Sequence, residues 1–563
     1  MHNEYKYFLG KFIKPHASTI VFLVVLSFAG TIFSFITPLL IKSLIDDVFI
    51  NGKINQLWII LAAIAGTYII SSISTYLSGY RKGKLELVLF SSVANEVFNA
   101  IQFAPIKKTQ DIKTGDLISR IIVNTRSAVN MFIYIIPDFI SNALRIIAPL
   151  IIMISLNLKL ALIVMMPLLL FIIPMFLFGK KLESTQKDAL VRIASIYSFL
   201  KENLSMVPLI KVFGLEMWSQ DKFDAQMRDY CNASISFTKS SSLNNSFDTL
   251  IYGMPTILLI IFGSPMVIQG LLTLGTFSAF MSYVALFFGP ISQFAHLWSY
   301  FKSSSPAYNR VNEIFQLDQD NGGKERLTIS NGIIEFDNVW FSYGNRRILH
   351  GFNATFRKGL NYVIGDNGIG KSTILKLICH LYPIERGSIR VDGQEIAGID
   401  RSDLRKNISI IFSDPYLFDA SIYENIQVGN LSASKEEIIQ AARHVSVHEF
   451  VMNLPEGYDT PVGEGGLRLS SGEKQKIALA RSILKNSPII LLDEVTKSVD
   501  EESRRSINEA IKSLKSKKTI IIITHNANDV EHDSNIVYLG RESQRQDRSS
   551  YPIDMSVSKI VFS

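Results

Sequence analysis

The sequence predicts a membrane α-helical bundle of six transmembrane helices that is fused to a soluble α/β domain. Hydrophobic residues make up 48% of the 563 residues and charged residues 19%, whereas soluble domains carry roughly 25% charged residues. The mean hydropathy is +0.23, and the apolar excess lies before residue 315. Beyond it, short apolar runs alternate with amphipathic stretches, which is typical of α/β domains. With only Cys231 and Cys379, the chain is not a disulfide scaffold.

Long windows without a charged residue mark the membrane spans. They cover Ala17–Ile41, Ile54–Tyr80, Ile146–Leu158, Leu160–Gly179 and Thr249–Phe301. A helix needs about 20 residues to cross roughly 30 Å of hydrocarbon. The last window is therefore too long for one crossing and predicts a helical hairpin that turns near 270–275. The third span extends backwards through an apolar stretch. We expect the six helices at about 17–41, 57–80, 132–157, 159–179, 249–270 and 276–300.

The distribution of basic residues predicts the orientation. Lysine and arginine concentrate in two long loops, 81–131 and 180–248, and the opposite loops are short and poor in them. Because cytoplasmic loops are enriched in these residues, we predict a multi-pass protein of the cytoplasmic (inner) membrane with both termini and the soluble domain in the cytoplasm. Both loops keep helical hydrophobic spacing, so we expect the transmembrane helices to continue into the cytosol. Anionic headgroups account for the net charge of +7, which does not indicate nucleic acid as a partner.

A change in composition after Phe315 divides the chain. Residues 316–332 are polar and glycine-bearing, which is typical of a linker. We expect a membrane domain at 1–315, this linker, a nucleotide-binding domain at 333–540 and a polar C-terminal tail at 541–563. Within the third of these segments, four apolar runs predict buried strands, at Asn361–Ile364, Ile408–Phe412, Ile489–Leu492 and Thr519–Ile523.

The first chemical motif is a phosphate-binding loop. It matches G-x-x-x-x-G-K-[ST] at Gly365-Asp366-Asn367-Gly368-Ile369-Gly370-Lys371-Ser372-Thr373, between an apolar run and a helical stretch. Backbone N–H groups of such a loop wrap a phosphate, and the helix N-terminus adds positive potential. We expect Lys371 to hold the β- and γ-phosphates of a nucleotide and the Ser372 hydroxyl to bind Mg²⁺.

A carboxylate pair follows the apolar run Ile489–Leu492. Asp493 is suited to bind Mg²⁺ through water, and Glu494 is placed to activate a water molecule. Such pairs occur at strand ends in many α/β proteins, so the pair by itself indicates little.

A third motif separates this chain from other phosphate-loop proteins. Upstream of the carboxylate pair, Leu469-Ser470-Ser471-Gly472-Glu473 resembles LSGGQ, the signature of the ATP-binding cassette (ABC) family. The resemblance implies that the signature residues of one cassette contact ATP bound to another, with Mg²⁺ as its metal. It further implies that Tyr343 stacks on adenine, that Asp500 is the family's aspartate after the catalytic glutamate, and that His525 contacts the γ-phosphate. Glu494 and His525 are then the catalytic residues.

Two departures from the family pattern affect the ATP site. Ser413, followed by Asp414, stands where family members carry a glutamine that joins the Mg²⁺ shell. The signature has Ser471 for its first glycine and Glu473 for its glutamine. Ser413 could still bind Mg²⁺ through water, or Asp414 could substitute. We predict that hydrolysis is present but slow or unusually coupled.

The membrane half also resembles the family. Residues 115–120 are similar to the first coupling-helix region of ABC exporters, and 210–216 to the segment before the second. The resemblance covers about 15–540 and implies a half-transporter in which a bundle with the ABC exporter fold is fused to an α/β P-loop ATP-binding cassette. One cassette cannot complete a shared ATP site, so we expect a homodimer, and a heterodimer is the alternative.

Polar residues in the membrane spans bear on the cargo. In the third span, Asp138 and Arg145 share a helix face with Asn142 between them, and intramembrane charges usually face a cavity or each other. The sixth span presents a mixed aromatic and polar set, Tyr283, Phe287, Gln293, His296 and Trp298. This lining suits an amphipathic peptide or a lipid-like molecule. The alternative is a structural ion pair beside an interfacial aromatic belt.

The expected function is ATP-driven export across the cytoplasmic membrane. The resemblance favours a modified antimicrobial peptide as cargo, because drug and lipid exporters seldom tolerate the departures at Ser413 and in the signature. A multidrug or lipid exporter (flippase) is the first alternative, and an ATP-binding membrane regulator that does not pump is the second. The expected partners are a second protomer, membrane lipid and the exported substrate.

Overall fold

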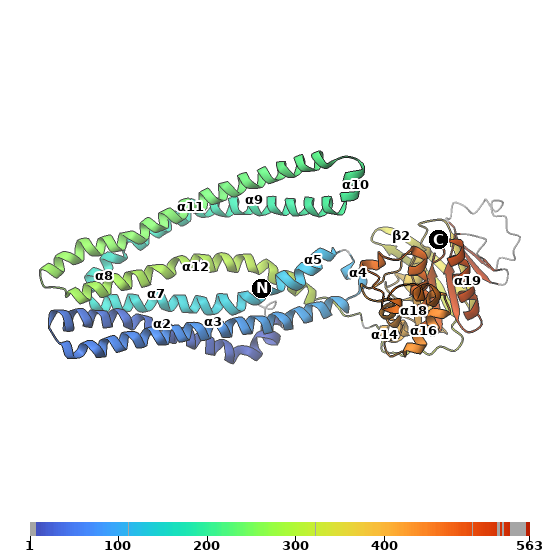
Figure 1. Ribbon diagram of the computed structural model, residues 1–563, viewed down its shortest axis with the longest axis horizontal. Helices are drawn as coiled ribbons and strands as arrows, with labels where there is room; N and C mark the ends of the chain where they lie inside the picture. The colour runs from blue at the N-terminus through green and yellow to red at the C-terminus, as the bar shows by residue number, and fades with distance from the viewer. Residues whose placement is uncertain are drawn as a thin grey trace. The chain divides into compact units, whose positions relative to one another are not determined.

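The computed structural model describes residues 7–110, 112–320, 322–497, 499–525, 530–531, 534–540 and 559–562. The chain forms two compact units (Figure 1). The helical unit comprises Met1–Phe98 and Gly115–Phe315, and the α/β unit comprises Asn99–Thr114 and Gln316–Ser563.

The helical unit is built of long helices joined by short turns. Two of them, α9 and α11, run side by side and are connected by the short α10 (Figure 1). The α-helices are α2 (Ala17–Ser43), α3 (Leu57–Gln102), α5 (Thr114–Ser119), α6 (Thr125–Asn130), α7 (Ile136–Leu156), α8 (Leu158–Met165), α9 (Ile172–Ser205), α10 (Val207–Val212), α11 (Glu216–Ile268) and α12 (Leu274–Phe315). Short π- and 3₁₀-helical segments link them: η1 (Leu9–Ile13), η2 (Lys14–His16), η3 (Leu44–Ile50), η4 (Ile54–Gln56), η5 (Arg120–Asn124), η6 (Met131–Ile135) and η7 (Met166–Phe171).

The chain is a multi-pass membrane protein. Among the described residues, five helical stretches are long and apolar enough to cross a membrane: Leu9–Ile50, Ile54–Gln102, Thr114–Leu156, Glu216–Ile268 and Leu274–Ile291. The shorter apolar stretch Leu158–Leu168 covers the start of the fourth predicted span, 159–179. Side chains 169–179 lie outside the described residues. Helices α3 and α11 run far past their charge-free windows, as their hydrophobic spacing predicts.

The predicted hairpin between the last two spans is present. Helix α11 ends at Ile268 and α12 begins at Leu274. The turn is held by Asp46, whose carboxylate oxygens accept the Gly275 N–H at 2.8 Å and the Thr273 hydroxyl at 2.6 Å. A Cβ at Gly275 would lie 2.4 Å from the Lys42 carbonyl oxygen, so this close approach requires glycine. The end of α2 is thereby fixed to the start of α12.

The α/β unit contains two sheets. An antiparallel sheet has the strand order β2-β1-β4-β5, and a parallel sheet has the order β10-β9-β3-β8-β7-β6. The four apolar runs of the sequence form β3, β6, β7 and β8, and β7 and β8 are buried along their whole length because helices and the second sheet cover them. The strands are β1 (Ile334–Tyr343), β2 (Arg346–Phe356), β3 (Gly359–Gly365), β4 (Arg386–Val391), β5 (Gln394–Glu395), β6 (Ile408–Ile411), β7 (Ile489–Asp493), β8 (Thr519–Ile523), β9 (Asn535–Gly540) and β10 (Lys559–Phe562).

Helices cover the parallel sheet on both faces and enclose two hydrophobic clusters. They are α13 (Lys371–Ile378), α14 (Arg401–Lys406), α15 (Ile422–Gln427), α16 (Lys435–Arg443), α17 (Val447–Met452), α18 (Ser471–Lys485) and α19 (Glu501–Leu514), with the short η8 (Gly457–Asp459) and η9 (Glu464–Gly466). The predicted polar tail includes strand β10, which pairs in parallel with β9. Residues 541–558 and 563 lie outside the described residues.

Two segments pack on the α/β unit although neither was predicted to be part of it. Helix α4 (Ile106–Thr109) precedes Gln110, whose side chain accepts a hydrogen bond of 2.7 Å from the Tyr382 hydroxyl. The linker 316–332 is tied down by Asp392, which accepts the backbone N–H groups of residues 330–333 at 2.7–3.0 Å. Asp320 of the same linker forms an ion pair with Arg405 at 2.6 Å. Charged side chains thus hold this segment on the α/β unit, whereas its composition alone indicated only a linker.

Candidate functional site

The parallel sheet gathers the predicted catalytic groups at one edge. Strand β8 lies between β3 and β7, with Val363 and Asp493 both in register with Ile523. The phosphate loop follows β3, the carboxylate pair ends β7, and His525 follows β8. In parallel sheets, ligands bind beyond the carboxyl ends of the strands. Local motifs that are far apart in the sequence therefore meet in one place.

The phosphate loop has the backbone that such a site requires. Gly370 has φ +113 and is the residue before α13, and a Cβ there would lie 2.5 Å from the Ile348 side chain. The Lys371 side chain is buried, and its ammonium donates to the carbonyl oxygens of Gly365 at 2.5 Å and Asp366 at 3.1 Å. Burial lowers the pKa of Lys371. The ammonium is therefore held against the loop backbone at the start of the helix.

Ser372 and Asp493 come together as predicted from their motifs. The Ser372 hydroxyl donates a hydrogen bond of 2.9 Å to the Asp493 carboxylate, although 121 residues separate them in the sequence. Burial raises the pKa of Asp493, and the hydrogen bond from Ser372 acts in the opposite sense. A divalent cation would likewise favour the ionised carboxylate. A hydroxyl and a carboxylate oxygen are ligand types that Mg²⁺ prefers.

Glu494 is held in an uncommon backbone conformation. Its φ is +51, which costs a residue with a Cβ about 1–2 kcal/mol. The Glu494 N–H donates to the Ile523 carbonyl at 3.1 Å, so β8 fixes the turn. Of its two carboxylate oxygens, Oε1 lies 3.7 Å from Nδ1 of His525. The two predicted catalytic residues are therefore neighbours.

Lys497 contacts Glu494 at this sheet edge, although none of the sequence motifs indicated it. Its ammonium forms an ion pair of 2.6 Å with Oε2 of Glu494. The Lys497 N–H also donates to the Glu494 carbonyl at 3.1 Å, which closes the turn after β7. A lysine three residues after a carboxylate on a turn is the sequence signal that could have found it.

The signature segment caps helix α18. Ser470 and Glu473 form a capping box: the Glu473 N–H donates to the Ser470 hydroxyl at 3.3 Å, and the Ser470 N–H donates to the Glu473 carboxylate at 2.8 Å. The glutamate that departs from the family pattern thus stabilises the first turn. Ser471 is exposed beside it.

Gly472 and Asp500 bring α18 and α19 close together. A Cβ at Gly472 would lie 2.9 Å from the Ser503 hydroxyl and 3.3 Å from the Asp500 carboxylate. Asp500 is the N-cap of α19 and accepts the Ser503 N–H at 2.8 Å, which lowers the pKa of Asp500. Both residues thus have a local structural role beside the ATP contact predicted for them.

Ser413 and Tyr343 flank the sheet edge. Ser413 follows β6 with its side chain exposed, and its carbonyl accepts a hydrogen bond of 2.7 Å from the buried Gln475 of α18. Tyr343 ends β1 and packs edge-to-face against Phe341 and Tyr382, with ring centroids 4.8 and 5.2 Å apart. The roles predicted for both, in the Mg²⁺ shell and at adenine, stay predictions.

Comparisons with known proteins cover nearly the whole chain. Residues 20–291 match the family described as ABC transporter transmembrane region, and residues 349–497 match the family described as ABC transporter. An ATP-dependent lipid A-core flippase of Syntrophus aciditrophicus (strain SB) is 29% identical over an alignment of 537 residues that covers 94% of this chain and 89% of the flippase. An ATP-binding/permease protein of Bacillus subtilis (strain 168), whose name assigns it provisionally to multidrug export, is 28% identical over 94% of this chain and 93% of its own length.

The fold also matches a solved structure. A bacterial Atm1-family ABC exporter with ATP bound superposes with a TM-score of 0.80 at 24% sequence identity, over 93% of this chain and 94% of the exporter. The two family matches lie in the order that the motifs predicted. The chain belongs to the ABC transporter family.

As an ABC exporter half-transporter, the chain is an ATPase that couples ATP hydrolysis to transport, with ATP and Mg²⁺ as cofactors. The residues at the sheet edge fit this pair. The buried Lys371 ammonium and the loop before α13 would hold the phosphates, and Ser372 with Asp493 would hold Mg²⁺. ATP supplies the phosphoryl group that is transferred to water, and the metal neutralises its charge.

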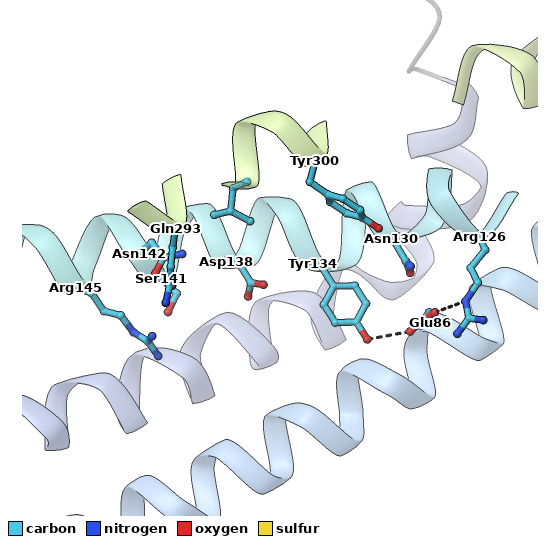
Figure 2. A pocket seen from close by; sticks show the side chains of 11 residues that line it. Glu86, Arg126, Asn130, Tyr134, Asp138, Ser141, Asn142, Arg145, Gln293 and Tyr300 are labelled. Atoms are coloured by element: carbon cyan, nitrogen blue, oxygen red, sulfur yellow. Dashed lines mark hydrogen bonds and ion pairs between the residues drawn. The ribbon is translucent and has the colours of Figure 1, made fainter. Parts of the chain in front are cut away.

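The helical unit contains a cavity of about 700 Å³ that is lined mainly by residues with polar side chains (Figure 2). Helices α3, α6, α7 and α12 and the segment η6 contribute its lining residues, all within this unit. Figure 2 shows two groups of them. One group is Ser141, Asn142, Arg145 and Gln293, and the other is Glu86, Arg126, Asn130, Tyr134 and Tyr300.

The carboxylates at this cavity are paired. Glu86 accepts hydrogen bonds from Arg126 at 3.0 Å and from the Tyr134 hydroxyl at 2.9 Å. Asp138 forms an ion pair of 2.5 Å with Lys82 of α3, whose side chain is only 12% exposed. Arg145 has no ion pair within the described part of the chain and lies at one end of the lining, beside neutral polar residues (Figure 2). The cavity thus presents an uncompensated positive charge.

Asp138 and Arg145 of the third predicted span do not form the structural ion pair that was one of the two predictions for them. Asp138 pairs with Lys82, and Arg145 is left facing the cavity. The predicted lining is wrong at two of its aromatic residues. Tyr283 and Phe287 are packed in the core, where the Tyr283 hydroxyl donates to the Phe35 carbonyl, and Gln293 does line the cavity. The side chains of His296 and Trp298 lie outside the described residues.

Proposed function

We propose that the chain works as a homodimeric exporter in the cytoplasmic membrane, with its termini and α/β unit in the cytoplasm, and that its cargo is an amphipathic molecule with an anionic group. The basic loops 81–131 and 180–248 support this orientation. The chain carries one phosphate loop and one signature segment, and sharing of ATP sites between two cassettes supports the dimer.

The observation that carries the cargo proposal is Arg145 at the cavity. A guanidinium is always charged, and its planar fork suits phosphate and carboxylate groups. The carboxylates nearby are already paired with Lys82 and Arg126, so they leave the Arg145 charge available. The apolar spans around the cavity would accommodate the hydrophobic part of the same molecule.

The relatives support a lipid or drug-like cargo over a peptide. The two compared above are named for lipid A-core flipping and for multidrug export, and neither for peptide export. The sequence favoured a peptide because of departures at Ser413 and in the signature. Glu473 has a local reason in the capping box, so this departure carries no information about cargo.

Stimulation of ATP hydrolysis tests the proposal. The purified full-length protein is reconstituted in vesicles of zwitterionic lipid, and phosphatidylglycerol or diacylglycerol with the same acyl chains is added. We expect the anionic lipid to raise the ATPase rate and Arg145→Gln to remove most of this stimulation, while Arg145→Lys keeps part of it. Lys159→Gln removes an exposed cation that does not line the cavity, and this control should respond as the wild type does. Equal stimulation by both lipids in the wild type would contradict the anionic cargo.

A further inference from the structure

The ion pair between Lys497 and Glu494 changes what the carboxylate can do. Lys497 lies at the surface with 45% of its side chain exposed, whereas the Glu494 side chain is 13% exposed. The pair therefore places an exposed cation on a nearly buried anion at the sheet edge. The Lys497 end of the pair is exposed, and ion pairs at the surface usually contribute little to stability, so a purely structural role predicts that removing the Lys497 ammonium has a small effect on stability.

Both oxygens of Glu494 face a basic group. Oε2 is 2.6 Å from the Lys497 ammonium, and Oε1 is 3.7 Å from Nδ1 of His525. The backbone gives the carboxylate little freedom, because φ of +51 and the hydrogen bond to Ile523 fix the turn. An oxygen that accepts a hydrogen bond from an ammonium is a poorer acceptor for the proton of a water molecule.

The charge of Lys497 is also felt at the phosphate loop. Burial lowers the pKa of Lys371, and the nearby Lys497 charge contributes in the same direction. Lys497 thus lies near both Lys371 and Glu494, and it pairs with the Glu494 carboxylate oxygen that His525 does not contact. No other ion pair of Glu494 with a lysine is found in the described part of the chain.

We propose that Lys497 is a positioning residue that restrains Glu494 and so keeps ATP hydrolysis slow until the pair is broken. In the hydrolytic step, a water oxygen forms a bond to the γ-phosphorus, the bond from this phosphorus to the β,γ-bridging oxygen breaks, and Glu494 accepts the proton of the water. Lys497 keeps its proton throughout and acts only on the carboxylate. The inference rests on Glu494 being the group that polarises water, and it is independent of the cargo.

The test compares kcat and KM for MgATP in the reconstituted full-length protein. We expect Lys497→Ala and Lys497→Gln to raise kcat about fivefold, which corresponds to ~1 kcal/mol in the barrier, with KM changed less than about twofold. Lys497→Arg restores the cation and should keep the wild-type rate. Lys512→Ala is the matched control, because it removes a lysine from an exposed ion pair with Glu531 on the same unit, and it should leave kcat unchanged.

A double variant separates this restraint from other effects. Lys497→Ala combined with Glu494→Gln should be as inactive as Glu494→Gln alone, since the gain acts through the carboxylate. An unchanged or lower kcat in both Lys497→Ala and Lys497→Gln would overturn the proposal, as would a gain that survives loss of Glu494. Because Lys497 is half exposed and is replaced by two different neutral residues, the test remains valid if one of the two variants folds poorly.

Discussion

The two units build their sites in different ways. In the α/β unit, short contiguous motifs follow β3, β7 and β8, and the parallel sheet brings them to one edge. In the helical unit, the cavity takes its lining residues from four helices and η6, and its charges pair between helices, as in Lys82–Asp138. The backbone therefore assembles the ATP site, whereas side-chain pairing assembles the cavity. Substitutions should distinguish the two units. Those at the ATP site should change the rate of ATP hydrolysis, and those at the cavity should change the stability of the protein or its response to a ligand.

The largest expected effect is on the chemistry of the α/β unit. Glu494→Gln should lower the ATPase rate at least about 100-fold, since a positioned general base contributes roughly 10²–10⁴-fold. Binding of MgATP should remain, because Lys371 and Ser372 are untouched. Glu501→Gln, in an exposed carboxylate at the start of α19, is the control. A Glu494→Gln protein that hydrolyses ATP at the wild-type rate would show that this carboxylate is not the base.

The next effect is on the stability of the helical unit. Asp138→Asn leaves the Lys82 ammonium, 12% exposed, without its partner, and should destabilise the protein by about 2 kcal/mol. Asp47→Asn is matched to it, because Asp47 pairs with the exposed Lys53 at 2.9 Å, and an exposed pair is worth about 0–1 kcal/mol. Thermal unfolding in detergent measures both. The same melting temperature for the two variants would contradict the assignment of Lys82–Asp138 as a structural pair.

Most of the ATP site could be predicted from the sequence. The phosphate loop, Asp493 and Glu494 were predicted because each motif defines its own local backbone, and the strand order does the rest. The orientation of Glu473 could also have been predicted, since serine followed three residues later by glutamate is a capping box.

The cavity could be predicted only in part. Asp138 and Arg145 share a helix face, but seven residues correspond to a rise of ~10 Å, which is too far for a direct ion pair. The partner of Asp138 is Lys82, 56 residues earlier and in another helix, and no local pattern indicates it. Tyr283 and Phe287 looked like cavity residues because aromatic side chains at helical spacing give the same pattern in a core.

The smallest expected effect concerns the metal shell. Ser413→Gln should raise the ATPase rate by about two- to fivefold, because a longer side chain with an amide oxygen can reach the Mg²⁺ shell, and outer-shell contacts tune metal sites. The rate as a function of Mg²⁺ concentration measures the effect, with Asp414→Asn tested in parallel. An unchanged rate and an unchanged Mg²⁺ dependence would contradict the prediction that Ser413 slows hydrolysis.

ATP-driven translocation of an anionic lipid across a vesicle membrane is the most direct test of export by this protein. The wild-type protein is reconstituted with fluorescent phosphatidylglycerol in one leaflet, and the label remaining accessible to a membrane-impermeant quencher is followed after MgATP is added. We expect translocation that requires MgATP, disappears with Glu494→Gln and falls strongly with Arg145→Gln, while zwitterionic phosphatidylcholine with the same tails moves more slowly. Translocation that proceeds equally without ATP, or hydrolysis that never moves the anionic lipid, would contradict it.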